Sequence, residues 1–153
     1  MVSGWREFYE SVKVRIPFCI ISANQEIEDL MRRTDIPGLV EDFTARSEAK
    51  DPITLFRILL VEHSFTGKRK PKVTIFSDNP PDLEAGRKLG WRTVAVIGRL
   101  MSNYDKDAES RLQLLGLNAD EMILDFNNPT VYVFQSGGTP RTNRSKRKLD
   151  PAG

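Results

Sequence analysis

The chain has 153 residues, of which 39% are hydrophobic and 29% are charged. These shares are ordinary for a soluble globular protein and exclude a disordered class. The 23 basic and 21 acidic residues nearly cancel, and the net charge of +2 argues against a general attraction to nucleic acid or to a membrane. The length predicts one domain with a single core.

Cysteine usage and the start of the chain bear on location. Cys19 is the only cysteine, which excludes an internal disulfide and a cysteine-based zinc site. Residues 1–14 are charged and lack the continuous apolar run of a secretory signal or a membrane span. We therefore expect a cytoplasmic protein with no membrane partner.

Hydrophobic patterns predict alternating helices and strands. Apolar residues recur every three or four positions over 4–14, as in an amphipathic helix, whereas the run 17–22 is continuous, as in a strand buried on both faces. Residues 52–63 have apolar side chains around much of the predicted helix, which indicates deep packing. The elements expected in chain order are helix 4–14, strand 17–22, helix 24–33, strand 40–45, helix 52–63, strand 72–77, a helix within 78–90, strand 92–98, a helix ending near Gly116, and strands 121–126 and 131–134.

This alternation predicts an α/β fold with a mainly parallel sheet. The domain is expected to span residues 1–134, because residues 135–153 lack apolar periodicity and predict a flexible basic tail. One alternative hypothesis is that the arginines and lysines of this tail contact nucleic acid. The near-neutral charge of the whole chain argues against it.

Polar residues follow two of the predicted strands, where ligands of parallel sheets bind. The hydroxyl of Ser22, with the backbone N–H groups of Ala23 and Asn24 at a helix start, can hold a phosphate oxygen. Lys50 precedes the helix that begins at Pro52 and can neutralise a phosphoryl charge. Each residue also has a simpler explanation: the serine can cap a helix, and the lysine can be a solvated surface residue.

Two carboxylates follow the strand over 72–77. Asp78 comes directly after the strand, and Asp82 falls one turn into the next helix. Both can therefore hold Mg²⁺ through oxygen ligands and waters. As an alternative, Asp78 is a helix cap and Asp82 an acid that the helix dipole favours. The order in which these residues occur decides between the two explanations.

Three stretches, CIISANQEIEDLMRR, EAKDPITLFRILL and TIFSDNPPDLEAGRKLGWRTVAVIG, resemble the haloacid-dehalogenase-like (HAD) superfamily. The likeness covers about residues 4–127. Ser22 matches the family's second motif, Lys50 its third, and Asp78 with Asp82 its fourth. The segment LEAGRKLGWRTVAV is similar to the family's helix and strand after the fourth motif, where an alanine and a glycine pack the helix closely on the sheet.

The resemblance implies a three-layer α/β/α, Rossmann-like core without a cap domain, and a Mg²⁺-dependent phosphomonoester hydrolase that forms an aspartyl-phosphate. Its substrate would be a small phosphorylated metabolite. Ser22, Ala23, Asn24 and Lys50 would bind the phosphoryl group, with Lys50 and Asp78 as catalytic candidates. Asp78 and Asp82 would place the metal.

The family's first motif, a buried strand that ends in Asp-x-Asp, has no counterpart, since no aspartate precedes Asp29. We therefore expect an N-terminally truncated core that is inactive by itself. A permuted site at Asp125 is an alternative, although position 127 is an asparagine. Because the missing strand is central in the family sheet, we expect a rearranged sheet, low stability or a partner chain that completes the sheet. A non-catalytic module that binds a phosphate ligand or a protein is the competing function.

Overall fold

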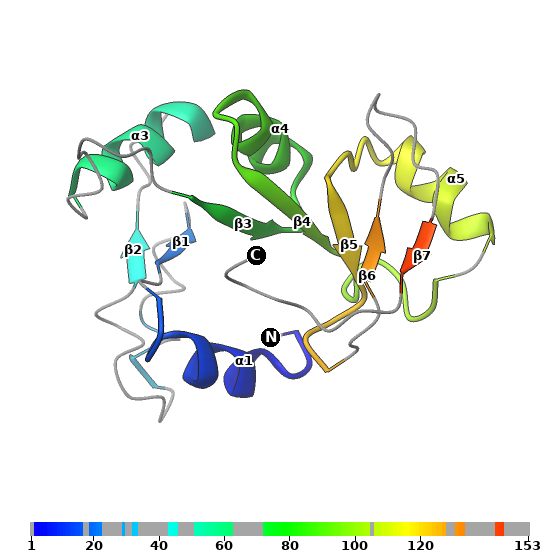
Figure 1. Cartoon of the computed structure of the whole chain (residues 1–153), viewed down its shortest axis with the longest axis horizontal. Coiled ribbons are helices and arrows are strands. Elements are labelled where there is room, and N and C mark those ends of the chain that lie inside the picture. Colours follow the sequence, from blue (N-terminus) through cyan, green and yellow to red (C-terminus); the bar gives the residue numbers. More distant parts are fainter. Residues whose placement is uncertain are drawn as a thin grey trace. The chain divides into compact units, whose positions relative to one another are not determined.

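The computed structural model describes residues 2–16, 19–22, 29, 32–33, 43–45, 51–62, 72–104, 106–127, 131–133 and 143–145. The chain divides into two compact units, Met1–Trp5 with Thr66–Gly153 (unit 1) and Arg6–Phe65 (unit 2). The elements labelled in Figure 1 are α1 (Trp5–Val12), β1 (Ile20–Ser22), β2 (Phe43–Ala45), α3 (Pro52–Glu62), β3 (Thr74–Ser77), α4 (Pro80–Lys88), β4 (Arg92–Val96), α5 (Lys106–Leu114), β5 (Glu121–Ile123), β6 (Val131–Val133) and β7 (Asn143–Ser145).

Unit 1 is built on a mixed sheet with the strand order β3-β4-β5-β6-β7 (Figure 1). Strands β3, β4 and β5 are parallel, whereas β6 and β7 are antiparallel to their neighbours. The α/β class is therefore confirmed. Strand β6 is antiparallel to β5 because only residues 124–130 separate the two strands, which is too few for a crossover helix.

The two faces of this sheet carry different apolar clusters, because successive strand residues point to opposite sides. On one face, α4 and α5 contribute Leu83, Ala108 and Leu112 to a cluster with Ala95 and Met122 of the strands. The opposite face carries a second cluster: Val94, Val96, Ile123 and Val131, with Val2, Phe76 and Phe126 packed against it. Strand β4 contributes to both clusters and is the buried centre of the parallel part.

Helix α4 lies unusually close to the sheet at Gly86. A Cβ atom at this position would stand 2.8 Å from Cγ2 of Ile75 in β3 and 3.1 Å from Cγ2 of Thr93 in β4. Leu83 and Ala85 of the same helix are buried beside it. The glycine that the sequence places in this helix therefore does pack it closely on the sheet, and the alanine before it is buried.

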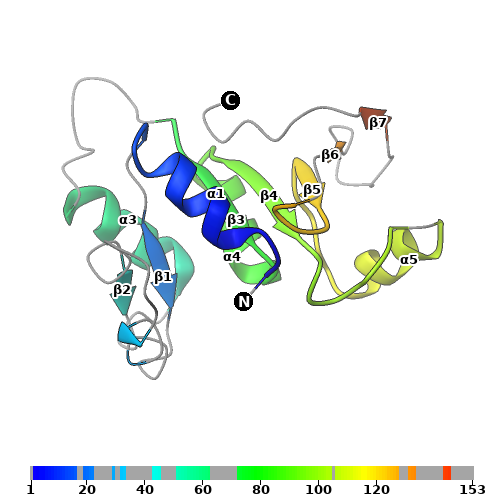
Figure 2. The same cartoon turned by 90° about the horizontal axis from the view of Figure 1, so that it is seen from below.

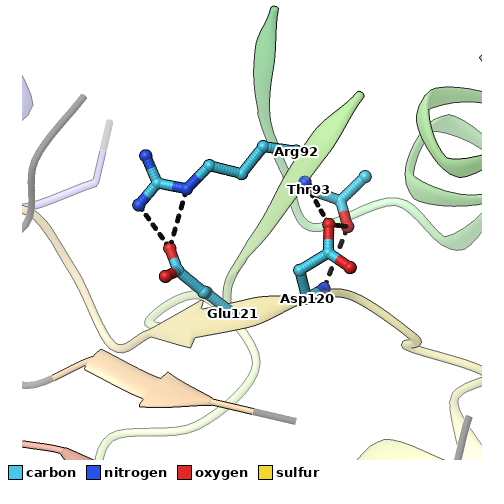
Figure 3. Close-up of polar contacts among 4 residues, drawn as sticks. All are labelled: Arg92, Thr93, Asp120 and Glu121. Carbon is cyan, nitrogen blue, oxygen red and sulfur yellow. Dashed lines mark hydrogen bonds and ion pairs between the residues drawn. The ribbon is translucent and has the colours of Figure 1, made fainter. Parts of the chain in front are cut away.

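Polar side chains join β4 to β5 at the start of both strands (Figure 3). Nε and Nη2 of Arg92 donate to Oε2 of Glu121, and the two side chains are only 17% and 8% exposed. Next to this pair, the backbone N–H of Thr93 donates to Oδ2 of Asp120 over 2.9 Å, and the Asp120 N–H donates to Oγ1 of Thr93 over 3.0 Å. A slip in strand register would leave the buried Thr93 and Glu121 without these partners, so the contacts specify the β4–β5 pairing.

Unit 2 contains the short parallel pair β1–β2 and the helices α1 and α3. In β1, Ile20 and Ile21 are half-buried rather than fully buried as their apolar run predicts. In α3, Leu55, Phe56 and Leu59 are buried, whereas Ile58 is 39% exposed. Deep packing around the helix is therefore wrong: α3 buries one side, as a surface helix does.

Other expectations have mixed outcomes. The helices predicted over 4–14, 52–63 and 78–90 are confirmed, with ends shorter by a few residues. The helix predicted over 24–33 lies almost entirely outside the described residues. Within the expected tail, Asn143–Ser145 form β7 and pair with β6, so these three residues are not structureless. Backbone hydrogen bonding to β6 orders them, and apolar periodicity could not reveal that.

We expect Gly86→Ala to destabilise the protein by about 1–3 kcal/mol, because the added methyl group must displace a stiff β-branched side chain. The sign is diagnostic, since glycine to alanine on an open helix face stabilises by up to ~1 kcal/mol. Urea unfolding of the variant measures it. Ile75→Ala removes the blocking Cγ2 atom, so Gly86→Ala should cost clearly less in that background. An equal cost in both backgrounds would contradict the close approach.

Candidate functional site

The predicted acidic residues lie where β3 ends and α4 begins. Asn79 is the N-cap of α4, with extended backbone angles (φ −102°, ψ 117°) and no capping bond from its own side chain. The backbone N–H of Asn79 donates to Oγ of Ser77 over 3.1 Å, so this N–H before the helix has a partner. Pro80 then begins the helix, where a missing N–H does no harm.

Asp82 is held in place by this serine. The Ser77 hydroxyl donates to Oδ2 of Asp82 over 3.1 Å in a partly buried position. Asp82 also lies in the first turn of α4, where the helix dipole favours a carboxylate. The structure thus gives Asp82 a structural role through Oδ2.

Asp78 is placed differently. It precedes the N-cap residue Asn79, so the explanation of Asp78 as the cap is wrong. Its side chain is 38% exposed, and Oδ2 lies 4.0 Å from Nη1 of Arg99, which is itself 71% exposed. Such an exposed ion pair contributes little to stability. Arg99 follows β4 as Asp78 follows β3, so the carboxyl ends of two neighbouring parallel strands present one acid and one base.

Asp78 and Asp82 have the ligand chemistry that suits Mg²⁺, but two carboxylates are too few ligands for this cation. Carboxylate oxygens are the ligands this cation prefers, and it takes about six oxygen ligands, usually including several waters. Among the described residues no group of three or more histidine, cysteine, aspartate or glutamate side chains is placed to hold a metal ion. Asp78 and Asp82 are therefore at most a pair of ligands that water or other groups must complete.

Asp125, the alternative nucleophile, follows β5 at the same edge of the sheet. Its Oδ1 accepts the backbone N–H of Asn127 over 2.9 Å, which closes a tight turn. The Asn127 side chain is engaged as well, because its Nδ2 donates to Oγ of Ser3 over 2.6 Å. Both residues therefore have structural roles, and an amide cannot supply the proton transfer that a second carboxyl would.

The predicted phosphate-binding residues fall mostly outside the described residues. Ser22 is the last residue of β1, as expected, and belongs to unit 2, but its side chain is not described. Ala23, Asn24 and Lys50 lie outside the described part of the chain. The residue after the lysine, Asp51, is well placed at the start of α3.

A hollow of about 590 Å³ lies in unit 1 at the start of α4. Its walls come from α4 and from the segment before β5, and they comprise Pro80, Pro81, Glu84, Arg87, Lys88, Gly116 and Asn118. Nζ of Lys88 lies 2.8 Å from Oε1 of Glu84, and this contact lowers the pKa of the glutamate. The acid and the base therefore pair with each other at the wall of the hollow.

Two residues that shape the site, Ser77 and Arg99, were not anticipated. Ser77 directly precedes the acidic pair in the sequence, and Arg99 follows the next strand, so their positions after parallel strands were the available signal.

None of the helices that the described residues form is long and apolar enough to span a membrane. Comparison with protein-family models, curated proteins and solved structures found no match.

Ser77→Ala should destabilise the protein by about 1 kcal/mol, because it removes a donor to Asp82 and an acceptor for the Asn79 N–H. Asp78→Ala should change stability by less than ~0.5 kcal/mol, since it removes only an exposed ion pair. Chemical unfolding of both variants measures the difference. Equal losses in the two variants would show that Asp78 has a structural role comparable to that of Ser77.

Asp51 caps α3 and should titrate at low pH. Hydrogen bonds from the hydroxyl and the N–H of Thr54, 2.7 and 2.9 Å long, lower the pKa of the Asp51 carboxyl. The stabilisation is therefore complete above the ordinary carboxyl pKa of about 4 and is lost as the pH falls through the lower folded-state value. Asp51→Asn keeps a cap without this titration, so it should flatten the pH dependence of unfolding in that range. An unchanged dependence would contradict this role.

Proposed function

We propose that this chain is a HAD-like phosphohydrolase core that binds Mg²⁺ and a phosphoryl group but lacks its own nucleophile. The observation that carries the proposal is the end of β3. Two carboxylates, Asp78 and Asp82, flank the start of a proline-led helix there, and that helix packs against the sheet through Gly86. The motif order along the chain supports the same assignment, together with a three-layer α/β/α architecture for the core.

The proposed roles follow the chemistry of the residues. Asp78 and Asp82 contribute oxygen ligands to Mg²⁺, and the metal would stabilise charge on a phosphoryl group. Ser22, Ala23, Asn24 and Lys50 bind the phosphoryl oxygens of a small phosphorylated metabolite. Arg99, 4.0 Å from Asp78, adds a positive charge at the same edge of the sheet. A cytoplasmic location is part of the proposal and rests on the single cysteine.

A partner strand can supply the missing nucleophile next to β3. In the part of the chain that the structure describes, β3 is hydrogen-bonded to β4 alone. Its residues, Thr74–Ser77, include none of the charges or prolines that protect strand edges. Their side chains are half-buried on both faces, less than those of the inner strand β4. A parallel strand paired with β3 would end beside Asp78, where an Asp-x-Asp motif would be needed.

The second candidate function is a non-catalytic module that binds a phosphate ligand or a protein partner. The structural roles of Asp82 and Asp125 favour it, because hydrogen bonds within the fold account for each residue without catalysis. The two hypotheses differ in what Asp78 does. In the first, its exposed carboxylate binds a metal ion, and in the second it is a surface acid.

Titration with Mg²⁺ followed by NMR tests the proposal. We expect the amide signals of Asp78, Asn79 and Asp82 to shift in the wild type and not in Asp78→Asn. Asp107→Asn, which changes an exposed acid of α5, is the matched control and should respond as the wild type does. No shift of the Asp78, Asn79 and Asp82 signals would refute the metal site and favour the non-catalytic module.

Hydrolysis of an aryl phosphate by the same samples tests the missing nucleophile. We expect no turnover with Mg²⁺ by the chain alone. Mg²⁺-dependent turnover that is lost in Asp125→Asn would establish the permuted site instead. Turnover that survives this substitution would point to another nucleophile within the chain and would also contradict the proposal.

A further inference from the structure

The first residues of unit 1, Val2–Gly4, run beside the loop that follows β5 (Figure 2). We call this segment the N-terminal strap. The carbonyl oxygen of Ser3 accepts the N–H of Phe126 over 3.1 Å, and its Oγ accepts Nδ2 of Asn127 over 2.6 Å. One residue of the strap thus binds two successive residues of the loop through its backbone and its side chain.

The contact between the strap and the loop requires a glycine at position 4. Its φ of +73° lies in the left-handed region, which side chains disfavour. A Cβ atom here would also stand 2.7 Å from the backbone nitrogen of Asn127, an atom that cannot move without its loop. Gly90 provides a natural comparison, because its φ is +75° but no atom lies within 4 Å of the corresponding Cβ position.

Val2 attaches the other end of the strap. It packs against the apolar cluster on the face of the sheet opposite α4 and α5, which Phe76 and Phe126 also contact. The rings of these two phenylalanines lie 5.7 Å apart. The strap therefore joins that face of the sheet to the turn at the carboxyl end of β5.

We propose that the N-terminal strap is a latch that holds the Asp125–Asn127 turn and can release while the β4–β5 core stays folded. Ser3 and Asn127 are exposed, which is typical of segments that open locally. Asp125 accepts its hydrogen bond from Asn127, the residue that the strap holds. Release therefore removes the strap's hydrogen bonds to Phe126 and Asn127 and changes which groups that edge of the sheet presents.

Amide hydrogen exchange measured by NMR tests the latch. The Phe126 amide reports the strap, and the Ile97 amide, which donates to the Ile123 carbonyl, reports the β4–β5 core. Gly4→Ala should accelerate exchange at Phe126 by roughly tenfold relative to Ile97, because strain and overlap both favour release. Gly90→Ala, with strain but no overlap, should leave the ratio of the two rates unchanged.

Asn127→Ala gives a second route that leaves both glycines in place, and it should accelerate Phe126 in the same direction. Equal acceleration of Phe126 and Ile97 in Gly4→Ala and Asn127→Ala would overturn the proposal, because the strap would then open only when the whole unit unfolds. No acceleration of Phe126 in either variant would overturn it too. If Gly4→Ala fails to fold, Asn127→Ala decides between these outcomes.

Discussion

The close approach of α4 to β3 and β4 at Gly86 is the constraint on which unit 1 depends. With a hydrogen atom in place of a side chain, the helix rests directly on Ile75 and Thr93. This contact determines where the first turn of α4 lies relative to the end of β3. The 3.1 Å hydrogen bond from Ser77 to Asp82 follows from that placement, so the packing of the helix and the geometry of the acids are one arrangement.

In this arrangement the neighbouring acids Asp78 and Asp82 have different roles. Asp82 accepts a hydrogen bond within the fold, whereas Asp78 stands before the helix cap and faces an exposed arginine. A carboxylate that contributes little to stability remains available to a cation. At the end of β5 the acid has a structural role instead, because Asp125 closes a turn and the strap holds that turn through Asn127. The carboxyl edge of the sheet therefore combines one open acid with two that the fold employs.

Local patterns predicted most elements because helix and strand periodicity, proline and glycine act over short distances. Pro52 and Pro80 begin helices as expected, and Gly90 follows the end of α4 with a positive φ. Burial was harder to predict, since it depends on neighbours from distant parts of the chain. The half-buried β1 and the exposed Ile58 of α3 show this. Strand β7 was missed for the same reason, because its order comes from pairing with β6.

The sequence by itself determined the α/β class, the positions of the acids after β3 and the small residues that let α4 approach the sheet. Each of these is written in residue type and spacing along one segment. Only the tertiary structure decided that Ser77 binds Asp82, that Arg99 faces Asp78 and that Ser3 reaches Asn127. These contacts join segments through the direction of side chains in space. Hydrogen bonds and ion pairs require distances of a few ångströms, which chain packing sets and sequence spacing does not.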